Sequence, residues 1–432
     1  MENKCYLSFI NLSVFPSVLV CYYWLAFQRK PKVKGGDLMF FSKKNAVIAF
    51  IILITAIGVA ISLLFSESPA DIKKIPANKE KKETTEVSKE AEVKTSEDQL
   101  KELIKNMSLD QKIGQLFLAR VPETNQIEDL KTYHLGGYLL FGRDMENETA
   151  DSLKSKIASY QEATDFPLLI ASDEEGGTVT RISQNTDIVA EKFKSPQELY
   201  KSGGIEAIKK DIDHKSSLFK VFGIHTGLYP VADVSTNPDS FIYDRTIGLD
   251  TDGTSDYISE VVKELHKNQI GSTLKHFPGS GDNSDSHTEI VRDKRSLDEI
   301  MTQSIPPFKA GIDAGADSIL VSHNIVEAID KNVPASISPK VHELIRKDLG
   351  FEGVVMTDDM DMNGLSDFIS QEEAALAALK AGNDLILSST YKTQIPVIKS
   401  AIQSGDYKEE ELDMSVLRVL TWKHELGLIS LD

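Results

Sequence analysis

The amino-acid sequence predicts an α/β fold, a single (β/α)8 barrel that is preceded by a transmembrane anchor and a disordered stalk. Three observations predict this arrangement. An uninterrupted apolar run covers residues 46–65, and a polar stretch without aromatic residues follows it. From about residue 98 onward, short apolar runs alternate with segments of helical periodicity, as expected of repeated strand–helix units.

The apolar run at residues 46–65 has the length of about 20 residues that a helix needs to span a bilayer. Lys43 and Lys44 precede it, and the excess of basic residues on the cytoplasmic side of membrane helices places the chain beyond the run outside the cell. Residues 39–66 are therefore expected to form a cytoplasmic stub and a single-pass anchor in the lipid bilayer of the cell membrane. Cleavage after Ala60 would release the extracellular part.

Two further segments flank this anchor. Residues 1–38 are interpreted as an extension outside the natural product, because Lys34–Asp37 can be encoded by a bacterial ribosome-binding sequence and Met39 follows at a suitable distance. Residues 67–97 are rich in Lys, Glu, Ser and Thr and bury too little apolar surface to fold alone. They are expected to form a flexible linker.

The region from residue 98 to 432 contains eight apolar, strand-like runs. They are residues 115–119, 137–141, 168–173, 227–233, 272–276, 318–323, 354–358 and 384–388. Helix-like stretches between them include residues 150–163, 205–222, 255–267, 339–349 and 372–381. Periodicity alone leaves a doubly wound open sheet as an alternative. Five of the runs end in ionisable residues, however, and barrel enzymes gather such residues at the carboxyl ends of their strands, so the barrel is preferred.

The charge and the cysteine content exclude several classes of protein. The formal net charge is −18, whereas a surface that binds nucleic acid needs an excess of Lys and Arg, so no nucleic-acid partner is expected. The two cysteines, Cys5 and Cys21, both lie before the anchor. The region from residue 98 onward therefore has neither a disulfide framework nor a cysteine-based zinc site.

Two loops carry residues suited to binding a polyhydroxylated ligand. Asp173 and Arg181 flank paired glycines after the third strand-like run, and the sharp turn is expected to bring both to the mouth of a pocket. An ordinary Asp–Arg ion pair is the alternative. After the fourth run, a long loop carries Arg245, whose fixed fork of donors suits several hydrogen bonds at once. Asp233, at the end of that run, is equally well explained as a helix cap.

The segment Lys275–His287 combines ionisable residues with a predicted bend. Lys275 and His276 end the fifth strand-like run, and two glycines and a proline turn the chain before Asp285 and His287. Asp285 can hydrogen-bond one ring nitrogen of His287, which raises the basicity of the other. A surface His with an acidic neighbour by chance is the alternative. Packing in a core does not explain this density of ionisable groups.

Three carboxylates, Asp358, Asp359 and Asp361, follow the seventh strand-like run. A carboxylate beneath a sugar ring can act as a nucleophile, and Asp358, nearest to the strand end, is expected to point into the barrel. Asp359 and Asp361 are expected to cap the next helix or to interact with its dipole. A Mg²⁺ or Ca²⁺ site would need more oxygen ligands around a common centre, so no metal or other cofactor is expected.

Residues from about 105 to 430 resemble glycoside hydrolase family 3, in its β-N-acetylglucosaminidase branch. The motifs that carry the resemblance stand in family order: Met107–Gln115, Gly136–Gly142, Asp173–Arg181, Asp233–Pro238, Lys275–His287 and Thr357-Asp358. The resemblance implies that residues 98–432 form a TIM-type catalytic barrel. It also implies a retaining exo-β-N-acetylglucosaminidase (a β-N-acetylhexosaminidase) that acts on peptidoglycan fragments or other GlcNAc-terminated glycans.

The resemblance further implies roles for individual residues. Asp358 would be the nucleophile, His287 would protonate the leaving sugar and then activate water, and Asp285 would orient His287. The family positions that hold the sugar beside the scissile bond are matched by Asp173, Arg181, Arg245, Lys275 and His276.

Two departures from the family pattern concern the pocket wall. The loop between Gly281 and Asp285 is one residue shorter than in many relatives, and Ser280 stands where a His is common. Loop length affects how the acid/base residue reaches the glycosidic oxygen. Ile247 replaces a frequent aromatic residue.

Three alternative functions are weighed against this expectation. A β-glucosidase or β-xylosidase of the same family typically lacks the Asp-x-His loop and takes its acid/base from elsewhere. An inactive, membrane-tethered wall-binding module would not need Asp358 and His287. A metal-dependent hydrolase built on His276, His287 and Asp358 is the weakest of the three.

Overall fold

The strands of the fold are short, and almost all of their residues are buried. The computed structural model describes residues 94–285 and 289–431. The strands are β1 (Phe117–Arg120), β2 (Gly137–Leu140), β3 (Leu169–Ser172), β4 (Thr273–Phe277), β5 (Arg292–Asp293), β6 (Ser318–Val321), β7 (Ile325–Val326), β8 (Val354–Thr357) and β9 (Ile386–Ser388). Every residue of β2, β3, β4, β6, β8 and β9 is buried, as expected of parallel strands that are covered on both faces.

Parallel pairing links the longer strands into a ring. One sheet has the order β3-β2-β1-β9 and another has the order β4-β6-β8. Isolated bridges join the two sheets: Met356 pairs with Leu385, and the segment that contains Thr226 and Val231 pairs with β3 on one side and with the chain around β4 on the other. The ring therefore brings the carboxyl ends of strands that are distant in sequence to one end of the fold.

The fourth strand-like run, residues 227–233, does not form a regular strand, and this part of the prediction is wrong. Leu228 has a φ of 45°, outside the extended region. Pro230 has no N–H to donate to a neighbouring strand. The backbone hydrogen bonds of this segment to its neighbours are therefore irregular, and its bridges, at Thr226 and Val231, stand isolated.

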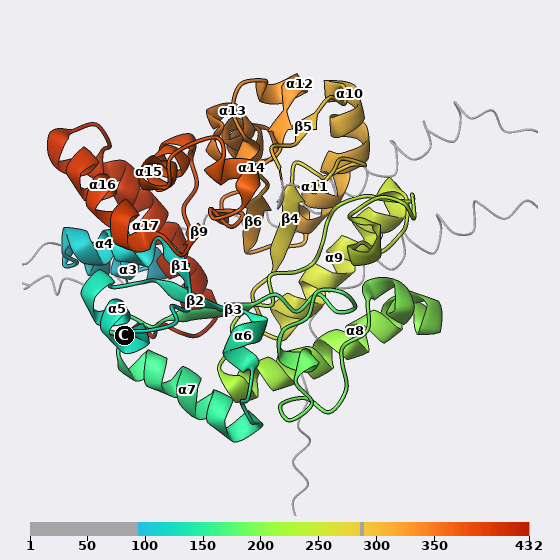
Figure 1. Ribbon diagram of the computed structural model, residues 1–432, viewed down its shortest axis with the longest axis horizontal. Helices are drawn as coiled ribbons and strands as arrows, with labels where there is room; N and C mark the ends of the chain where they lie inside the picture. The colour runs from blue at the N-terminus through green and yellow to red at the C-terminus, as the bar shows by residue number, and fades with distance from the viewer. Residues whose placement is uncertain (1–93, 286–288, 432) are drawn as a thin grey trace, which may run out of the picture. The chain divides into compact units, whose positions relative to one another are not determined.

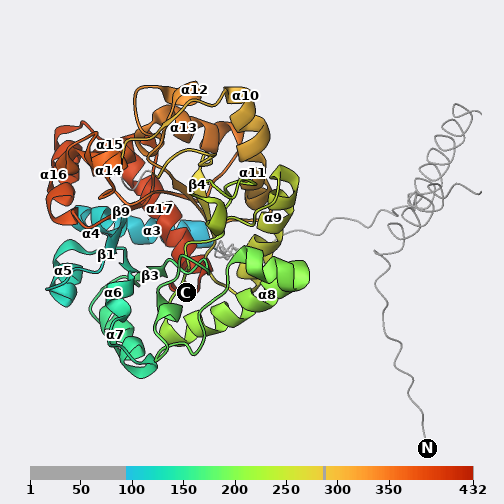
Figure 2. The same cartoon turned by 45° about the vertical axis from the view of Figure 1, so that its right-hand side comes forward.

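Helices surround the strands, as Figure 1 and the turned view in Figure 2 show. The α-helices are α3 (Ser96–Lys105), α4 (Leu109–Gln115), α5 (Gln126–Tyr133), α6 (Gly142–Met145), α7 (Ala150–Glu162), α8 (Pro196–Phe222), α9 (Thr251–Lys267), α10 (Leu297–Glu299), α11 (Ile305–Asp313), α12 (Glu327–Asp330), α13 (Pro339–Glu343), α14 (Asn363–Ser366), α15 (Gln371–Ala381), α16 (Tyr391–Ser404) and α17 (Glu409–Glu425). Short 3-10 helices are η1 (Ile182–Gln184), η2 (Tyr243–Arg245) and η4 (Ala335–Ile337), and π-helical turns are η3 (Ile300–Ser304) and η5 (Leu344–Asp348).

Each predicted helix-like stretch coincides with a helix, and local capping explains where they begin. The helix α8 begins earlier than predicted, because Ser195 and Glu198 form a capping box and Pro196 occupies the first turn. Its continuity is broken at Gly203 and Gly204, the latter with a φ of 64°. The alternation of helices and parallel strands supports the α/β class.

The predicted fold class also included a membrane-spanning helix, and that part is corrected. Across residues 94–285 and 289–431, no helix is both long and apolar enough to cross a bilayer. The run at residues 46–65 lies outside the described residues, as does all but the end of the predicted linker. Within the described region, the helix α3 begins at Ser96, where Thr95 and Asp98 form a capping box.

Candidate active site

A pocket of about 480 Å³ lies at the end of the ring where the strands terminate in polar residues. Arg120 ends β1, Asp173 follows β3, Lys275 and His276 lie in β4, and Asp358 follows β8. Arg181, Arg245 and Asp285 also line the pocket. The fold thus brings together the predicted site residues, except that His287 lies outside the described residues.

Asp173 and Arg245 are connected through a buried cluster that includes Glu175, a residue not predicted for the site. Lys275 Nζ lies 2.8 Å from Asp173 Oδ1 and 2.7 Å from Glu175 Oε1. Arg245 donates to both oxygens of Glu175, from Nε over 3.0 Å and from Nη2 over 2.7 Å. Burial alone would raise the pKa of Glu175, but Arg245 and Lys275 hold it well below its usual range. The two cations therefore face the pocket with fixed positions and with their charges compensated.

His276 has its ring fixed by partners on both nitrogens. Nδ1 lies 2.7 Å from Asp233 Oδ2, and Nε2 lies 3.0 Å from Arg245 Nη2. Because a guanidinium only donates, Nε2 accepts from Arg245 and Nδ1 donates to Asp233. Asp233 also accepts from the backbone N–H groups of His276 and Ser280, at 3.1 Å and 2.6 Å. Asp233 is thus a partner of the site rather than a helix cap.

The pKa of Asp233 is lowered despite its complete burial. Burial alone would raise it, but the hydrogen bonds from His276 and from the Ser280 N–H, together with the charge of Arg245, hold it below its ordinary value. The carboxylate therefore stays ionised where it can orient the imidazole. This arrangement leaves His276 as a rigid element of the pocket wall.

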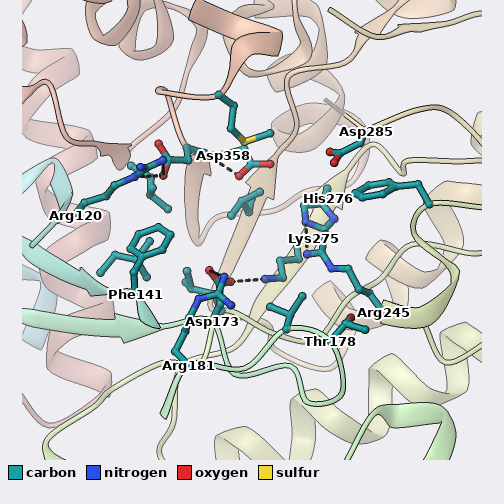
Figure 3. A pocket seen from close by; sticks show the side chains of 18 of the residues that line it. Arg120, Phe141, Asp173, Thr178, Arg181, Arg245, Lys275, His276, Asp285 and Asp358 are labelled. Carbon is teal, nitrogen blue, oxygen red and sulfur yellow. Dashed lines mark hydrogen bonds and ion pairs between the residues drawn. The ribbon is translucent and has the colours of Figure 1, made fainter. Parts of the chain in front are cut away.

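Asp358 lies between the two sides of the pocket, with Arg120 and Phe141 on one side and Asp285 on the other (Figure 3). Its Oδ1 accepts from the backbone N–H of Asp359 over 2.8 Å. A carboxylate in this position can approach a ligand that the buried cluster holds. The arrangement suits a nucleophile.

Asp359 and Asp361 do not cap the next helix, α14, whose N-cap is Met362 without a side-chain hydrogen bond, so the capping part of that expectation is wrong. The side chain of Asp359 pairs with Arg120 at the end of β1, with 2.5 Å between Oδ2 and Nε. Asp361 accepts from the N–H of Ser389 and from the hydroxyl of Thr390. Asp361 connects the chain after β8 to the chain after β9, and Asp359 connects it to β1, which lies beyond β9 in the ring. Both contacts follow from the ring of strands and not from neighbours in the sequence.

Arg181 is placed by an aromatic ring as well as by a carboxylate. Its guanidinium carbon lies 5.8 Å from the centroid of Phe141, and its Nη2 lies 3.8 Å from Asp173 Oδ2. The ion pair is long, because Lys275 takes the closer position at Asp173. The guanidinium is therefore not saturated by Asp173, which agrees with a role in binding a polar ligand.

Several pocket residues escaped prediction from the sequence. Glu175 stands in the predicted Asp173–Arg181 loop, where a further acidic residue is expected to be exposed to solvent. Arg120 follows an apolar run with no motif around it, and Phe141 lies in the Gly136–Gly142 motif, where nothing in the residue type marks it as part of the site. Only the Asp-Glu-Glu run before the two glycines indicated that cations lie nearby. Three adjacent carboxylates at a turn repel one another, and the fold is destabilised unless cations compensate their charge.

Comparison with known proteins assigns the family. The model of the glycosyl hydrolase family 3 N terminal domain matches residues 108–422. The chain belongs to glycoside hydrolase family 3. This confirms the family that the motifs resemble, and the protein is a glycoside hydrolase.

Curated members of the family resemble the chain over most of its described length. The beta-hexosaminidase LpqI of Mycobacterium tuberculosis is 29% identical over 325 residues, which cover 72% of this chain and 82% of that protein. The beta-hexosaminidase of Tolumonas auensis is 30% identical over 295 residues, which cover 65% of this chain and 84% of that protein.

Solved structures of the family share the fold. A glycoside hydrolase family 3 beta-N-acetylglucosaminidase from Paenibacillus sp. superimposes with a TM-score of 0.69 at 28% identity, covering 76% of this chain and 65% of that chain. The structure of M. tuberculosis LpqI also gives a TM-score of 0.69, at 26% identity, covering 75% of this chain and 96% of that chain. The chain thus spans slightly less than two thirds of the Paenibacillus structure and nearly all of the LpqI structure.

Proposed function

We propose that this glycoside hydrolase is a retaining exo-β-N-acetylglucosaminidase that removes terminal β-linked GlcNAc. The observation that carries the proposal is the pocket itself, in which Asp358 faces a buried, charge-compensated cluster of Asp173, Lys275, Glu175 and Arg245. Such a cluster offers fixed donors and acceptors to sugar hydroxyls. Family relatives named as beta-hexosaminidases support GlcNAc as the sugar.

The proposed reaction has two steps. In the first, an oxygen of Asp358 attacks the anomeric carbon, the glycosidic bond breaks, and the departing oxygen takes a proton from His287. In the second, His287 accepts a proton from water, the water oxygen attacks the anomeric carbon, and the bond to Asp358 breaks. Two inversions at one carbon retain its configuration. Asp285 keeps His287 in the tautomer and orientation that both transfers need.

Asp173, Arg181, Arg245, Lys275 and His276 are proposed to hold the sugar beside the scissile bond. Their geometry favours this role over one in folding alone, because Arg181 and His276 are held at the pocket wall by partners behind them. A rigid set of donors avoids the entropic cost of ordering long side chains when the ligand arrives. The first step then begins from a sugar already placed above Asp358.

The source of the substrate and the place of the reaction are proposals from the sequence. We propose peptidoglycan fragments as the substrate and an extracellular location for the catalytic region. Release of GlcNAc from purified peptidoglycan fragments, with and without the peptide stem, tests the first part. Fragments that stay intact while a chitin disaccharide is cleaved would contradict it.

A β-glucosidase activity is the second candidate function. One relative, from Cellulomonas fimi, bears the name beta-N-acetylglucosaminidase/beta-glucosidase and is 26% identical over 340 residues. Both activities would use the same two-step chemistry. The difference lies at the 2-position of the sugar, so the two are separated by substrate preference and not by mechanism.

The mechanism is tested by the configuration of the first product. Proton NMR of a reaction in progress should show β-GlcNAc before mutarotation produces the α-anomer. Asp358→Ala should lose turnover, whereas Asp367→Ala, which changes an exposed Asp of the same segment, should keep it. Formation of the α-anomer first, or turnover by Asp358→Ala, would contradict the proposal.

A further inference from the structure

We propose that Arg120 and Asp359 are positioning residues that hold and tune the carboxylate of Asp358. This inference rests on the proposed function, in which Asp358 is the nucleophile. It goes beyond that function because neither residue belongs to the motifs of the predicted site. Arg120 comes from the end of β1 and Asp359 from the residue after Asp358, so the pair links segments 239 residues apart in the sequence.

Asp359 is held at three of its oxygens, two in the side chain and one in the backbone. Its Oδ2 lies 2.5 Å from both Nε and Nη2 of Arg120, and its Oδ1 accepts from the N–H of Asp361 over 3.0 Å. Its carbonyl oxygen lies 2.9 Å from His323 Nε2. Since the side chain and the carbonyl are both held, the N–H of Asp359 has little freedom. That N–H is the group that donates to Asp358 Oδ1 over 2.8 Å.

Arg120 is in turn held by its surroundings. Its guanidinium carbon lies 4.9 Å from the centroid of the Phe141 ring, and Phe141 follows β2. The Arg120 side chain is 30% exposed and that of Asp359 is 10% exposed, so the pair is largely withdrawn from water while Arg120 still borders the pocket. An ion pair shielded in this way is more strongly coupled than a surface pair.

The charge of the pair bears on the reactivity of Asp358. Asp359 brings a second carboxylate beside the nucleophile, and an uncompensated like charge would raise the pKa of Asp358. Arg120 compensates that charge, while the N–H of Asp359 fixes one oxygen of Asp358. Burial raises the pKa of Asp359 to about 6, against the effect of Arg120.

Other charged groups also face Asp358 across the pocket. They are Asp173 and Arg181 after β3, Asp244 and Arg245 in η2, Lys275 and His276 in β4, and Asp285 in the following loop. Variants of Arg120 and Asp359 leave all of these unchanged. Arg120 Nε also lies 3.7 Å from Asp361 Oδ2. The Asp359 variant leaves Asp361 unchanged, so opposite shifts of the pH profile in the two single variants report on the Arg120–Asp359 pair.

The test is a double-mutant cycle on the full chain with Arg120→Met, Asp359→Asn and the double variant. Each single variant should lower kcat by about 10-fold to about 100-fold, with a smaller change in KM, because a misplaced reacting group affects the chemical step most. The loss of kcat in the double variant should be smaller than the product of the two single losses. Each single variant leaves one member of the ion pair without its partner, whereas the double variant removes both members.

The pH profile of kcat/KM separates positioning from a purely structural role. Loss of the Arg120 cation should move the acidic limb to higher pH, and loss of the Asp359 anion should move it to lower pH, each by about one pH unit. The double variant should return to the wild-type limb. Circular dichroism over the same pH range shows where each variant is folded, and rates are compared only at those pH values.

Lys380→Met and Asp406→Asn provide a matched control, because this ion pair lies on the surface with 39% and 60% of the side chains exposed. Losses that multiply in the Arg120–Asp359 double variant, or acidic limbs that stay with the wild type in both single variants, would overturn the inference. If Asp358→Ala keeps turnover, the proposed function fails first. If Asp358→Ala is inactive but the Arg120 and Asp359 variants affect activity no more than the Lys380 and Asp406 variants do, only this inference fails.

Discussion

Arg245 and Glu175 form a two-point ion pair in the wall of the pocket, with Nε and Nη2 donating to the two carboxylate oxygens over 3.0 Å and 2.7 Å. The Glu175 side chain is 1% exposed, and it also lies 2.7 Å from Lys275 Nζ. One buried carboxylate thus compensates two cations that the sequence predicts to bind the sugar. The positions of Arg245 and Lys275 in the pocket wall thus depend on a carboxylate that does not itself line the pocket.

Glu175→Gln should destabilise the fold and weaken substrate binding. The substitution leaves Arg245 and Lys275 close together with one anion fewer, and breaking a buried ion pair costs about 3–5 kcal/mol. Thermal and urea unfolding should show a loss of this order, and KM should rise more than kcat falls. The control Glu343→Gln removes an exposed partner of Lys347 and should change stability by less than about 1 kcal/mol. Equal effects of the two substitutions would contradict the structural role of Glu175.

The stability that Glu175 and Asp233 contribute should be lost in acid. Both pKa values are lower in the folded state than the ordinary value, so both groups stabilise the fold above their unfolded pKa. That contribution falls as the pH drops below about 4.5, where the unfolded chain takes up protons more readily. Urea unfolding at pH 6 and at pH 4 should show a smaller pH effect in Glu175→Gln than in the wild type.

Lys423 should make stability rise with pH in a second, alkaline range. Its ammonium is buried, its Nζ lies 2.7 Å from Gln115 Oε1, and burial lowers its pKa to about 7. Between this value and its ordinary value of 10.5, the unfolded state binds more protons than the folded state, so stability rises with pH.

Urea unfolding between pH 7 and pH 9 tests the effect of Lys423. The wild type should gain stability relative to Lys423→Met as the pH rises. The exposed Lys380→Met should run parallel to the wild type. A constant difference between the wild type and Lys423→Met across this range would contradict the shifted pKa.

Phe241 should contribute to binding of the leaving group. It is 43% exposed, lines the pocket, and also lines a side cleft together with Ser280 and Ser284. These serines stand in the loop that carries the proposed acid/base residue, so Phe241 lies on the side from which the leaving group departs. Aromatic surface lost there should cost about 1 kcal/mol, or about fivefold in kcat/KM.

The prediction for Phe241 depends on the leaving group. Phe241→Ala should slow hydrolysis of N,N′-diacetylchitobiose and leave methyl β-GlcNAc almost unaffected, while Phe241→Trp should restore the disaccharide activity. Phe368→Ala provides a control, because Phe368 is similarly exposed but does not line the pocket. Equal losses on both substrates would show that Phe241 acts through the fold.

His287→Ala should reduce activity most on substrates with poor leaving groups. A general acid contributes about 10²-fold to about 10⁴-fold when the departing oxygen needs a proton, and a nitrophenolate needs little help. Rates on methyl β-GlcNAc and on 2,4-dinitrophenyl β-GlcNAc should therefore diverge, and Asp285→Asn should show the same trend more weakly. An equal loss on the two substrates would remove His287 from the acid role.

Local patterns in the sequence predicted much of the fold and most of the pocket. Apolar runs placed β2, β6 and β8 within a few residues, because buried parallel strands leave a continuous apolar signature. Ionisable strand ends identified Asp173, Lys275 and Asp358, because the carboxyl ends of the strands meet at one end of a barrel.

The remaining features depend on contacts between distant segments. Glu175 is recognisable as a site residue only once Arg245 and Lys275 are placed beside it. The pairing of Asp359 with Arg120 requires β1 and β8 to lie on either side of β9 in the ring, which no local motif encodes. The irregular segment around Thr226 looked like a strand because its apolar composition hides the effect of Pro230.

Hydrolysis of β-linked GlcNAc is the activity proposed for the pocket. It is tested most directly by kcat/KM of the full chain on the p-nitrophenyl β-glycosides of GlcNAc, glucose and xylose under one set of conditions. We expect a clear preference for the GlcNAc substrate, with turnover abolished in Asp358→Ala. A preference for the glucoside or the xyloside would contradict it.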